Sequence, residues 1–84
     1  MERIHTYTSG AVYMGQWKGG MRFGIGLMTW KDKSRYDGEW QYNQIFGEGT
    51  FKHKSGDSYT GTWSNNKANG YGVYKTAGGA EYRG

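Results

Sequence analysis

The chain has 84 residues, a net charge of +4, no Cys, 16 Gly, four Trp, eight Tyr and three Phe. A chain this short forms at most one domain and buries a modest share of its surface. The lack of Cys excludes disulfides and thiolate metal sites. No apolar run approaches the roughly 20 residues that span a bilayer, and residues 1–5 lack the apolar core of a signal peptide. We therefore expect a cytoplasmic protein.

A strict repeat organises the chain from residue 13 onward. The pattern Tyr-x-Gly-x-Trp occupies residues 13–17, 36–40 and 59–63, a step of 23 residues, and Tyr82, Arg83 and Gly84 begin a further copy. Gly-x-Gly follows in the same register at residues 24–26, 47–49 and 70–72. A fixed period of this length indicates one structural unit stacked in a row. Such arrays usually present a binding surface rather than a catalytic centre.

Each copy is expected to form a β-hairpin. Alternation along a strand places Tyr13 and Trp17 on one face. Gly20, Asn43 and Asn66 share one repeat position, seven residues after the Tyr, and these residue types accept the positive φ of a tight turn.

The pairing within the first hairpin follows from where its turn lies. A two-residue turn centred at residues 20–21 would set Trp17 opposite Gly24, Gly15 opposite Gly26 and Tyr13 opposite Met28. Large rings would then lie over bare glycine backbone, an arrangement in which an aromatic side chain compensates for a glycine in a strand.

Consecutive hairpins would build one antiparallel meander. Strand continues after each Gly-x-Gly, and turn residues at 32–34, 55–57 and 78–80 return the chain to the next copy. We predict an all-β fold, an elongated single-layer antiparallel sheet of seven or more strands without a second layer to form a conventional core. Residues 1–84 are expected to form one domain with repeats at 13–35, 36–58 and 59–81. Residues 1–12 would be a partial preceding repeat, and residues 82–84 the start of a further one.

These shared features resemble the MORN repeat (membrane occupation and recognition nexus), and the resemblance covers Val12 to Gly84. The departures are local: Tyr42 and Asn65 stand at the position of Gly19, and Asn69 stands where other copies have Phe. The resemblance implies an elongated sheet used for scaffolding in cytoskeletal and ciliary assemblies, including axonemal radial spokes. Similar repeats precede lipid kinase domains and occur in membrane-junction proteins.

Candidate catalytic and cofactor residues are few. His5 and His53 lie at different repeat positions, and although Ser55 and Asp57 follow His53, a turn explains that trio better than a catalytic triad. The acidic residues are scattered singly, which predicts no metal site. Gly-x-Gly continues as strand, which disfavours nucleotide binding. We predict a protein that is not an enzyme, with no catalytic residues, cofactor or metal. We also expect no nucleic-acid partner, because the aromatic residues recur at positions that the fold itself requires.

Two surfaces remain as candidate binding sites. Apolar residues outside the Tyr and Trp pattern, and rings on the second strands, indicate a protein partner; the residues predicted to contact it are Ile25, Leu27, Phe51, Tyr71 and Tyr74. Basic residues around the inter-repeat loops suggest instead docking to anionic phospholipids such as phosphoinositides, possible for a module attached to a larger enzyme; they are Lys31, Lys33, Arg35, Lys52, Lys54 and Lys75.

We favour a non-enzymatic scaffold that holds protein partners in a cytoskeletal assembly. A cilium, flagellum or axoneme is the narrower setting that the resemblance implies. Both edges of a single-layer sheet stay open, so self-association is a further expected contact.

Overall fold

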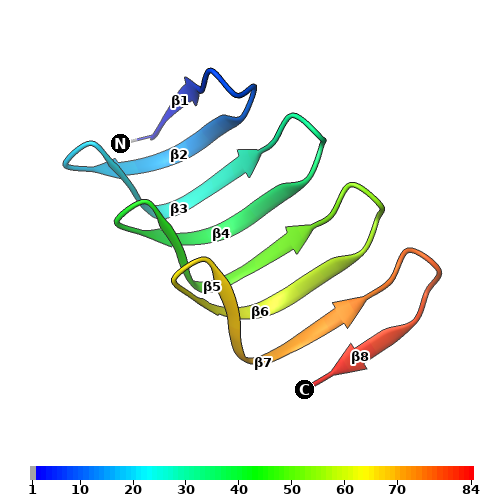
Figure 1. The fold of residues 1–84 in the computed structure, drawn as a ribbon. Coiled ribbons are helices and arrows are strands. Elements are labelled where there is room, and N and C mark those ends of the chain that lie inside the picture. Colours follow the sequence, from blue (N-terminus) through cyan, green and yellow to red (C-terminus); the bar gives the residue numbers. More distant parts are fainter. Residues whose placement is uncertain (1) are drawn as a thin grey trace.

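The computed structural model describes residues 2–84, with side chains from residue 4 onward. Its described residues form one antiparallel sheet of eight strands whose spatial order follows the chain (Figure 1). The strands are β1 (Glu2–Thr6), β2 (Val12–Lys18), β3 (Met21–Thr29), β4 (Arg35–Gln41), β5 (Gln44–Lys52), β6 (Ser58–Ser64), β7 (Lys67–Lys75) and β8 (Glu81–Arg83). The molecule measures 38 × 25 × 17 Å along its principal axes. The predicted elongated sheet of consecutive hairpins is confirmed.

Two kinds of connection alternate along the sheet. Tight turns at residues 19–20, 42–43 and 65–66 have positive φ at both central residues, as two-residue hairpins prefer. The hypothesis that the first turn centres at residues 20–21, one residue later, is wrong. Longer loops at residues 7–11, 30–34, 53–57 and 76–80 join one repeat to the next, and each holds one left-handed residue: Gly10, Lys33, Gly56 and Gly79 respectively.

A bulge displaces the turn from its expected place. Gly15 pairs with Gly26 and Tyr13 with Met28, as predicted, but Trp17 faces Arg22 and not Gly24. Two extra residues in β3 cause the shift, and Gly24 takes a φ of 91° there. Gly24 instead faces Trp40 on β4, in the next repeat. The same shift recurs in the later hairpins.

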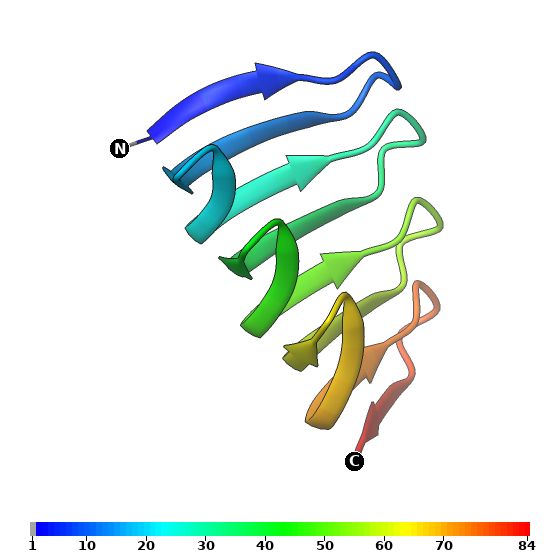
Figure 2. The same ribbon diagram turned by 60° about the vertical axis from the view of Figure 1, so that its left-hand side comes forward.

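The bulges bend the sheet. The first residues of β3, β5 and β7 curl forward out of the rest of the sheet, which is plainest in Figure 2. The sheet thus has a concave inner face, defined here as the face that carries Tyr13, Tyr36 and Tyr59, and a convex outer face. The bend allows one layer to bury a small core on the inner face, consisting of Ala11, Tyr13, Met28, Tyr36, Trp40 and Ile45.

Stacked rings fill this core. The Tyr13 and Tyr36 side chains are fully buried, and their rings occupy the space that a Cβ on Gly26 or Gly49 would need. Trp40 packs edge-on against both tyrosines, with ring centroids 5.4 Å from each, and its Nε1 donates to the Gly26 carbonyl at 3.0 Å. The predicted packing of rings on glycine is therefore present, although Tyr and not Trp lies over the second glycine of each Gly-x-Gly.

Asparagines in the tight turns form hydrogen bonds to the repeat before them. The backbone N–H of Arg22 donates to Asn43 Oδ1 at 2.8 Å, and the Asn43 N–H donates to the Arg22 carbonyl at 3.0 Å. Asn66 makes the same two bonds with Ile45, at 2.8 and 3.1 Å. Each pair therefore holds one hairpin turn against the second strand of the repeat before it.

Candidate binding groove and outer face

A hollow of about 510 Å³ lies at the centre of the inner face. We call it the central hollow; it is lined by Arg22, Trp30, Trp40, Asn43, Ile45, Phe51, Trp63 and Asn66. The bend positions these residues, because Arg22 and Ile45 stand on the curled starts of β3 and β5. Three indole rings and one phenyl ring make up half of the lining residues, while one cation and two amides supply polar groups. Such a lining suits an apolar side chain flanked by polar contacts.

Arg22 is the only cation among the described side chains that line the central hollow. Its guanidinium lies 4.9 Å from the centroid of the Trp40 ring, within cation–π distance. Its Nη2 and Nε donate to the Asn43 carbonyl and Oδ1 at 3.1 and 3.2 Å. These bonds fix the guanidinium but use only part of its five N–H donors. An acidic group in the central hollow could therefore bind there.

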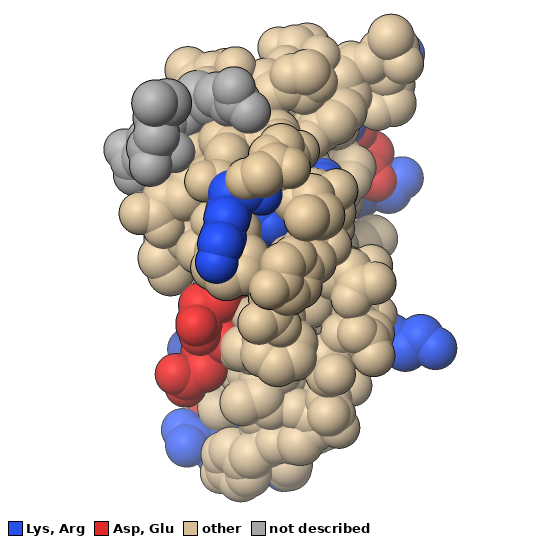
Figure 3. Space-filling model, turned by 90° about the vertical axis from the view of Figure 1, so that its left-hand side faces the viewer, with Lys and Arg blue, Asp and Glu red and all other residues tan. Residues whose placement is uncertain are grey.

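Further hollows extend the central one into a groove across the strands. A hollow of about 460 Å³ toward β1 shares Arg22 and Asn43 with it. Another, of about 320 Å³ toward β7, shares Phe51; we call it the C-terminal hollow, and it is lined by Phe51, His53, Asp57, Ser58, Tyr59 and Tyr74. Together these hollows make up what we call the inner groove. Seen from the side of the tight turns, charged atoms cover only a minor part of the surface (Figure 3).

The residues predicted to contact a protein partner lie on two faces. Phe51 and Tyr74 line the inner groove. Alternation along the strands places Ile25, Leu27 and Tyr71 on the outer face, where Ile25 and Tyr71 are 54% and 64% exposed. The five residues therefore do not form one continuous surface, and their role in binding stays a prediction.

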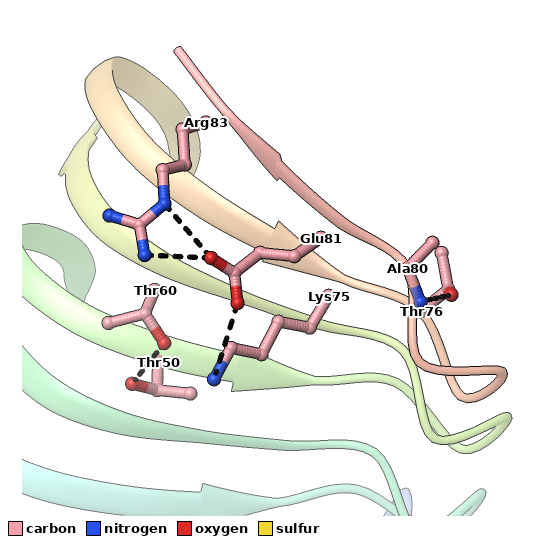
Figure 4. A network of polar contacts seen from close by, with 7 residues as sticks. All are labelled: Thr50, Thr60, Lys75, Thr76, Ala80, Glu81 and Arg83. Carbon is pink, nitrogen blue, oxygen red and sulfur yellow. Dashed lines mark hydrogen bonds and ion pairs between the residues drawn. The ribbon is translucent and has the colours of Figure 1, made fainter.

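Polar contacts dominate the outer face over the C-terminal strands (Figure 4). Thr50 and Thr60 share a hydrogen bond of 3.0 Å across β5 and β6. Glu81 accepts from Arg83 Nε at 2.9 Å and lies 3.9 Å from Lys75 Nζ. The Thr50–Thr60 pair thus lies between the exposed apolar residues Ile25 and Tyr71 of this face.

The basic residues proposed for lipid contact gather near the long loops. Lys31 and Lys33 lie in the loop after β3 and Lys54 in the loop after β5. Arg35 on β4 directly faces Lys52 on β5, so two like charges stand side by side. Lys75 departs from this pattern because Glu81 partly neutralises it.

The loop at His53 is a turn, as expected from its residue types. The Ser55 N–H donates to His53 Nδ1 at 3.2 Å, and the Asp57 N–H donates to Ser55 Oγ at 3.4 Å. The Asp57 carboxylate instead reaches the next repeat, where it accepts from the Ala77 N–H at 2.8 Å and from the Tyr74 hydroxyl at 3.0 Å. These bonds, that from Ala77 above all, lower the pKa of Asp57 below its usual value and keep it anionic.

Several groove residues were not predicted from the sequence. Arg22 and Ile45 were not singled out because they stand on the starts of β3 and β5, which curl only because of the bulge. Trp30, in the loop after β3, was not singled out either. The first glycine of each Gly-x-Gly was the available signal, since a glycine inside a strand often marks a bulge.

Two absences concern only the residues that the structure describes. Among residues 2–84 no helix is long and apolar enough to cross a bilayer. Among the side chains that the structure describes, those of residues 4–84, no three His, Asp or Glu lie close enough together to hold a metal ion.

Comparison with protein families identifies the repeat. The family model for the MORN repeat matches residues 13–35, 36–58 and 59–81, the same three units that the 23-residue period defines. No curated protein matches the chain.

Proposed function

The chain belongs to the MORN-repeat family, a family of non-enzymatic repeat modules, and we propose that it is a scaffold that holds a segment of a partner protein in its inner groove. The fold and the family are consistent with a binding or scaffold module. The assignment of the binding site to the inner face, with a polypeptide segment as its occupant, is our proposal.

The observation that carries this proposal is the aromatic lining of the central hollow. Trp30, Trp40 and Trp63 surround it, with Ile45 and Phe51 between them. Tryptophan is enriched among the residues that dominate protein–protein binding energy, and an apolar centre with polar groups at its rim is typical of such interfaces. The occupant we propose is a polypeptide segment with apolar side chains in the central hollow and an acidic group beside Arg22.

A cytoskeletal assembly is the setting we propose for this scaffold, with a cilium or axoneme as the narrower choice. The support is the family resemblance, since scaffolds of this kind serve such assemblies. Fluorescent tagging of the chain in ciliated cells would test it. Signal along microtubule or actin structures supports the setting, and a uniform distribution contradicts it.

Selection of peptides from a random display library against the 84-residue protein tests the choice of face. Binding is measured by the change in tryptophan fluorescence. We expect Phe51→Ser to weaken the selected peptides and the double variant Ile25→Ser, Leu27→Ser, on the outer face, to leave them unchanged. The opposite result would move the partner site to the outer face. Circular dichroism should show the β signal in both variants.

Anionic lipid is the second candidate occupant of this molecule, at a different surface. The supporting observation is the direct pairing of Arg35 with Lys52, because like charges facing each other across strands are unfavourable without a counter-anion. Phosphoinositide vesicles should then co-sediment with the protein at physiological salt, and Arg35→Gln with Lys52→Gln should abolish this. Binding that disappears at physiological salt would be nonspecific surface attraction and would contradict a docking role.

A further inference from the structure

The place equivalent to the C-terminal hollow in the preceding repeat is filled by side chains. Moving 23 residues back along the chain, its lining becomes Met28, Trp30, Ser34, Arg35, Tyr36 and Phe51. Met28, Ser34 and Tyr36 are at most 4% exposed. The Trp30 ring packs on Phe51 with a centroid distance of 5.9 Å and covers this place.

Five of the six lining positions differ between the two repeats, and two of these differences open the hollow and place a carboxylate in it. His53 stands where Trp30 stands one repeat earlier, and Asp57 stands where the buried Ser34 stands. The His53 imidazole is smaller than an indole and accepts a hydrogen bond from the Ser55 N–H of its own loop. A hollow of about 320 Å³ therefore stays open. Asp57 places a carboxylate at the same spot. One substitution therefore opens a cavity and the other lines it with a negative charge.

Aromatic rings complete the lining of this hollow. Phe51, Tyr59 and Tyr74 lie on neighbouring strands in direct register, Phe51 facing Tyr59 and Tyr59 facing Tyr74. The Tyr74 hydroxyl donates to Asp57 Oδ2 at 3.0 Å, which positions both groups. Several rings beside one carboxylate are what an alkylammonium group requires, because ring faces and an anion both attract a cation that has left water.

From these features we infer that the C-terminal hollow binds an alkylammonium group, carried by a lysine side chain or a methylated lysine of the bound partner. The site follows from the lining alone, whereas its assignment to a partner's lysine rests on the proposed function. Together with Arg22 it gives the inner groove opposite charges along its length. The occupant would accordingly carry an acidic group toward β3 and a basic group toward β7.

Choline and 3,3-dimethylbutan-1-ol test the site directly, because the two molecules share a shape and differ in charge. Titrated into the 15N-labelled protein, choline should shift the amide signals of Ser58, Tyr59 and Tyr74. The neutral alcohol should bind about tenfold more weakly, as expected for a cation–π site. n-Butylammonium serves as the third probe, and its affinity relative to choline separates an unmodified from a methylated lysine.

Variants distinguish the contribution of the Asp57 charge to choline binding from that of the open hollow. Asp57→Asn should weaken choline about tenfold, whereas Asp32→Asn, the same charge change in the preceding loop and outside the hollow, should have no effect. His53→Trp should refill the hollow and abolish binding while the melting temperature stays equal or rises. Equal binding of choline and the alcohol, unchanged binding by Asp57→Asn, or no amide shift with choline would each overturn the inference.

The same measurements keep this inference distinct from the proposed function. Peptides in the central hollow are detected by the tryptophan signals, and probes in the C-terminal hollow by Ser58 and Tyr59. A failed choline titration with intact peptide binding overturns the ammonium site alone. The reverse result would leave the ammonium site in place and overturn the peptide scaffold.

Discussion

The stacked Tyr and Trp rings of the inner face are arranged in the same way in every repeat, but they are buried to different degrees. Tyr36 is bracketed by Trp40 of its own repeat and Trp63 of the next, with centroids at 5.4 and 5.5 Å, and is fully buried. Tyr59 packs on Trp63 at 5.2 Å but has no tryptophan of a following repeat among the described residues, and it is only half-buried. A core tyrosine is therefore fully buried only where the tryptophan of the next repeat packs against it. Stability is therefore shared between neighbouring repeats.

The largest expected effect comes from filling the space under a sealed ring. In Gly49→Val the new side chain would collide with the Tyr36 ring, which cannot move because it is enclosed on all sides. We expect a loss of about 5 kcal/mol, comparable to the whole stability of a domain this size, and thus no cooperative melting by circular dichroism.

Matched glycines sharpen this test. Gly72→Val makes the same collision with the less enclosed Tyr59 and should cost less. Gly78→Ala, whose new Cβ would meet only Thr76 Oγ1 at 3.9 Å, should be neutral. An unchanged melting temperature for Gly49→Val would refute the packing of rings on glycine.

Removing a sealing tryptophan should also show the difference between repeats. Trp40→Ala deletes a 4% exposed ring that contacts Tyr13 and Tyr36, and should cost about 3–5 kcal/mol in the free energy of unfolding. Trp63→Ala removes a half-buried ring and should cost less. Urea denaturation of both variants measures the two values, and equal losses would contradict the account.

Alkaline pH should unfold the protein through the sealed tyrosines. Burial raises the pKa of Tyr13 and Tyr36 above the usual value near 10, because the phenolate is disfavoured inside the core. Their contribution to stability is therefore complete below about pH 10 and is lost as the pH rises toward the folded-state pKa. Phenolate absorbance should show two tyrosines that ionise only as the β signal disappears. In Tyr36→Phe, one such tyrosine should remain.

The smallest expected effect lies in the long loops. Lys33 has a φ of 76°, whereas the equivalent residue in the other three loops is glycine. Lys33→Gly should relieve this left-handed strain and raise the free energy of unfolding by about 0.5–1 kcal/mol. Gly56→Ala, at φ 101°, should change it in the opposite direction. A loss of stability in Lys33→Gly would show that the Lys33 side chain contributes more than its backbone costs.

The sequence predicted the hairpins and the ring packing because both depend on short-range spacing. The 23-residue period placed every turn within one residue, and alternation put Tyr13 and Tyr36 on the buried face. The pairing of Trp17 with Gly24 was wrong because alternation alone cannot reveal two extra residues in β3. Those residues preserve which face each side chain occupies and shift only its partner.

The binding groove was harder to predict for the same reason. Arg22 stands at the curled start of β3 and Trp30 just after its end, and alternation along a strand does not predict that both line the central hollow. Phe51 was predicted as a contact residue, but its face follows from the register and not from its apolar character. Asp57 was weighed as part of a triad and assigned to a turn, and its bond to Tyr74 depends on the next repeat.

The indole N–H signals of the four tryptophans report directly whether a peptide binds in the inner groove. A 15N-labelled sample is titrated with a peptide selected from the random library. We expect shifts of the Trp30, Trp40 and Trp63 indole signals, whose rings line the central hollow, with little change at Ile25 and Tyr71 of the outer face. Shifts confined to Ile25, Leu27 and Tyr71 would contradict this expectation and place the partner on the outer face.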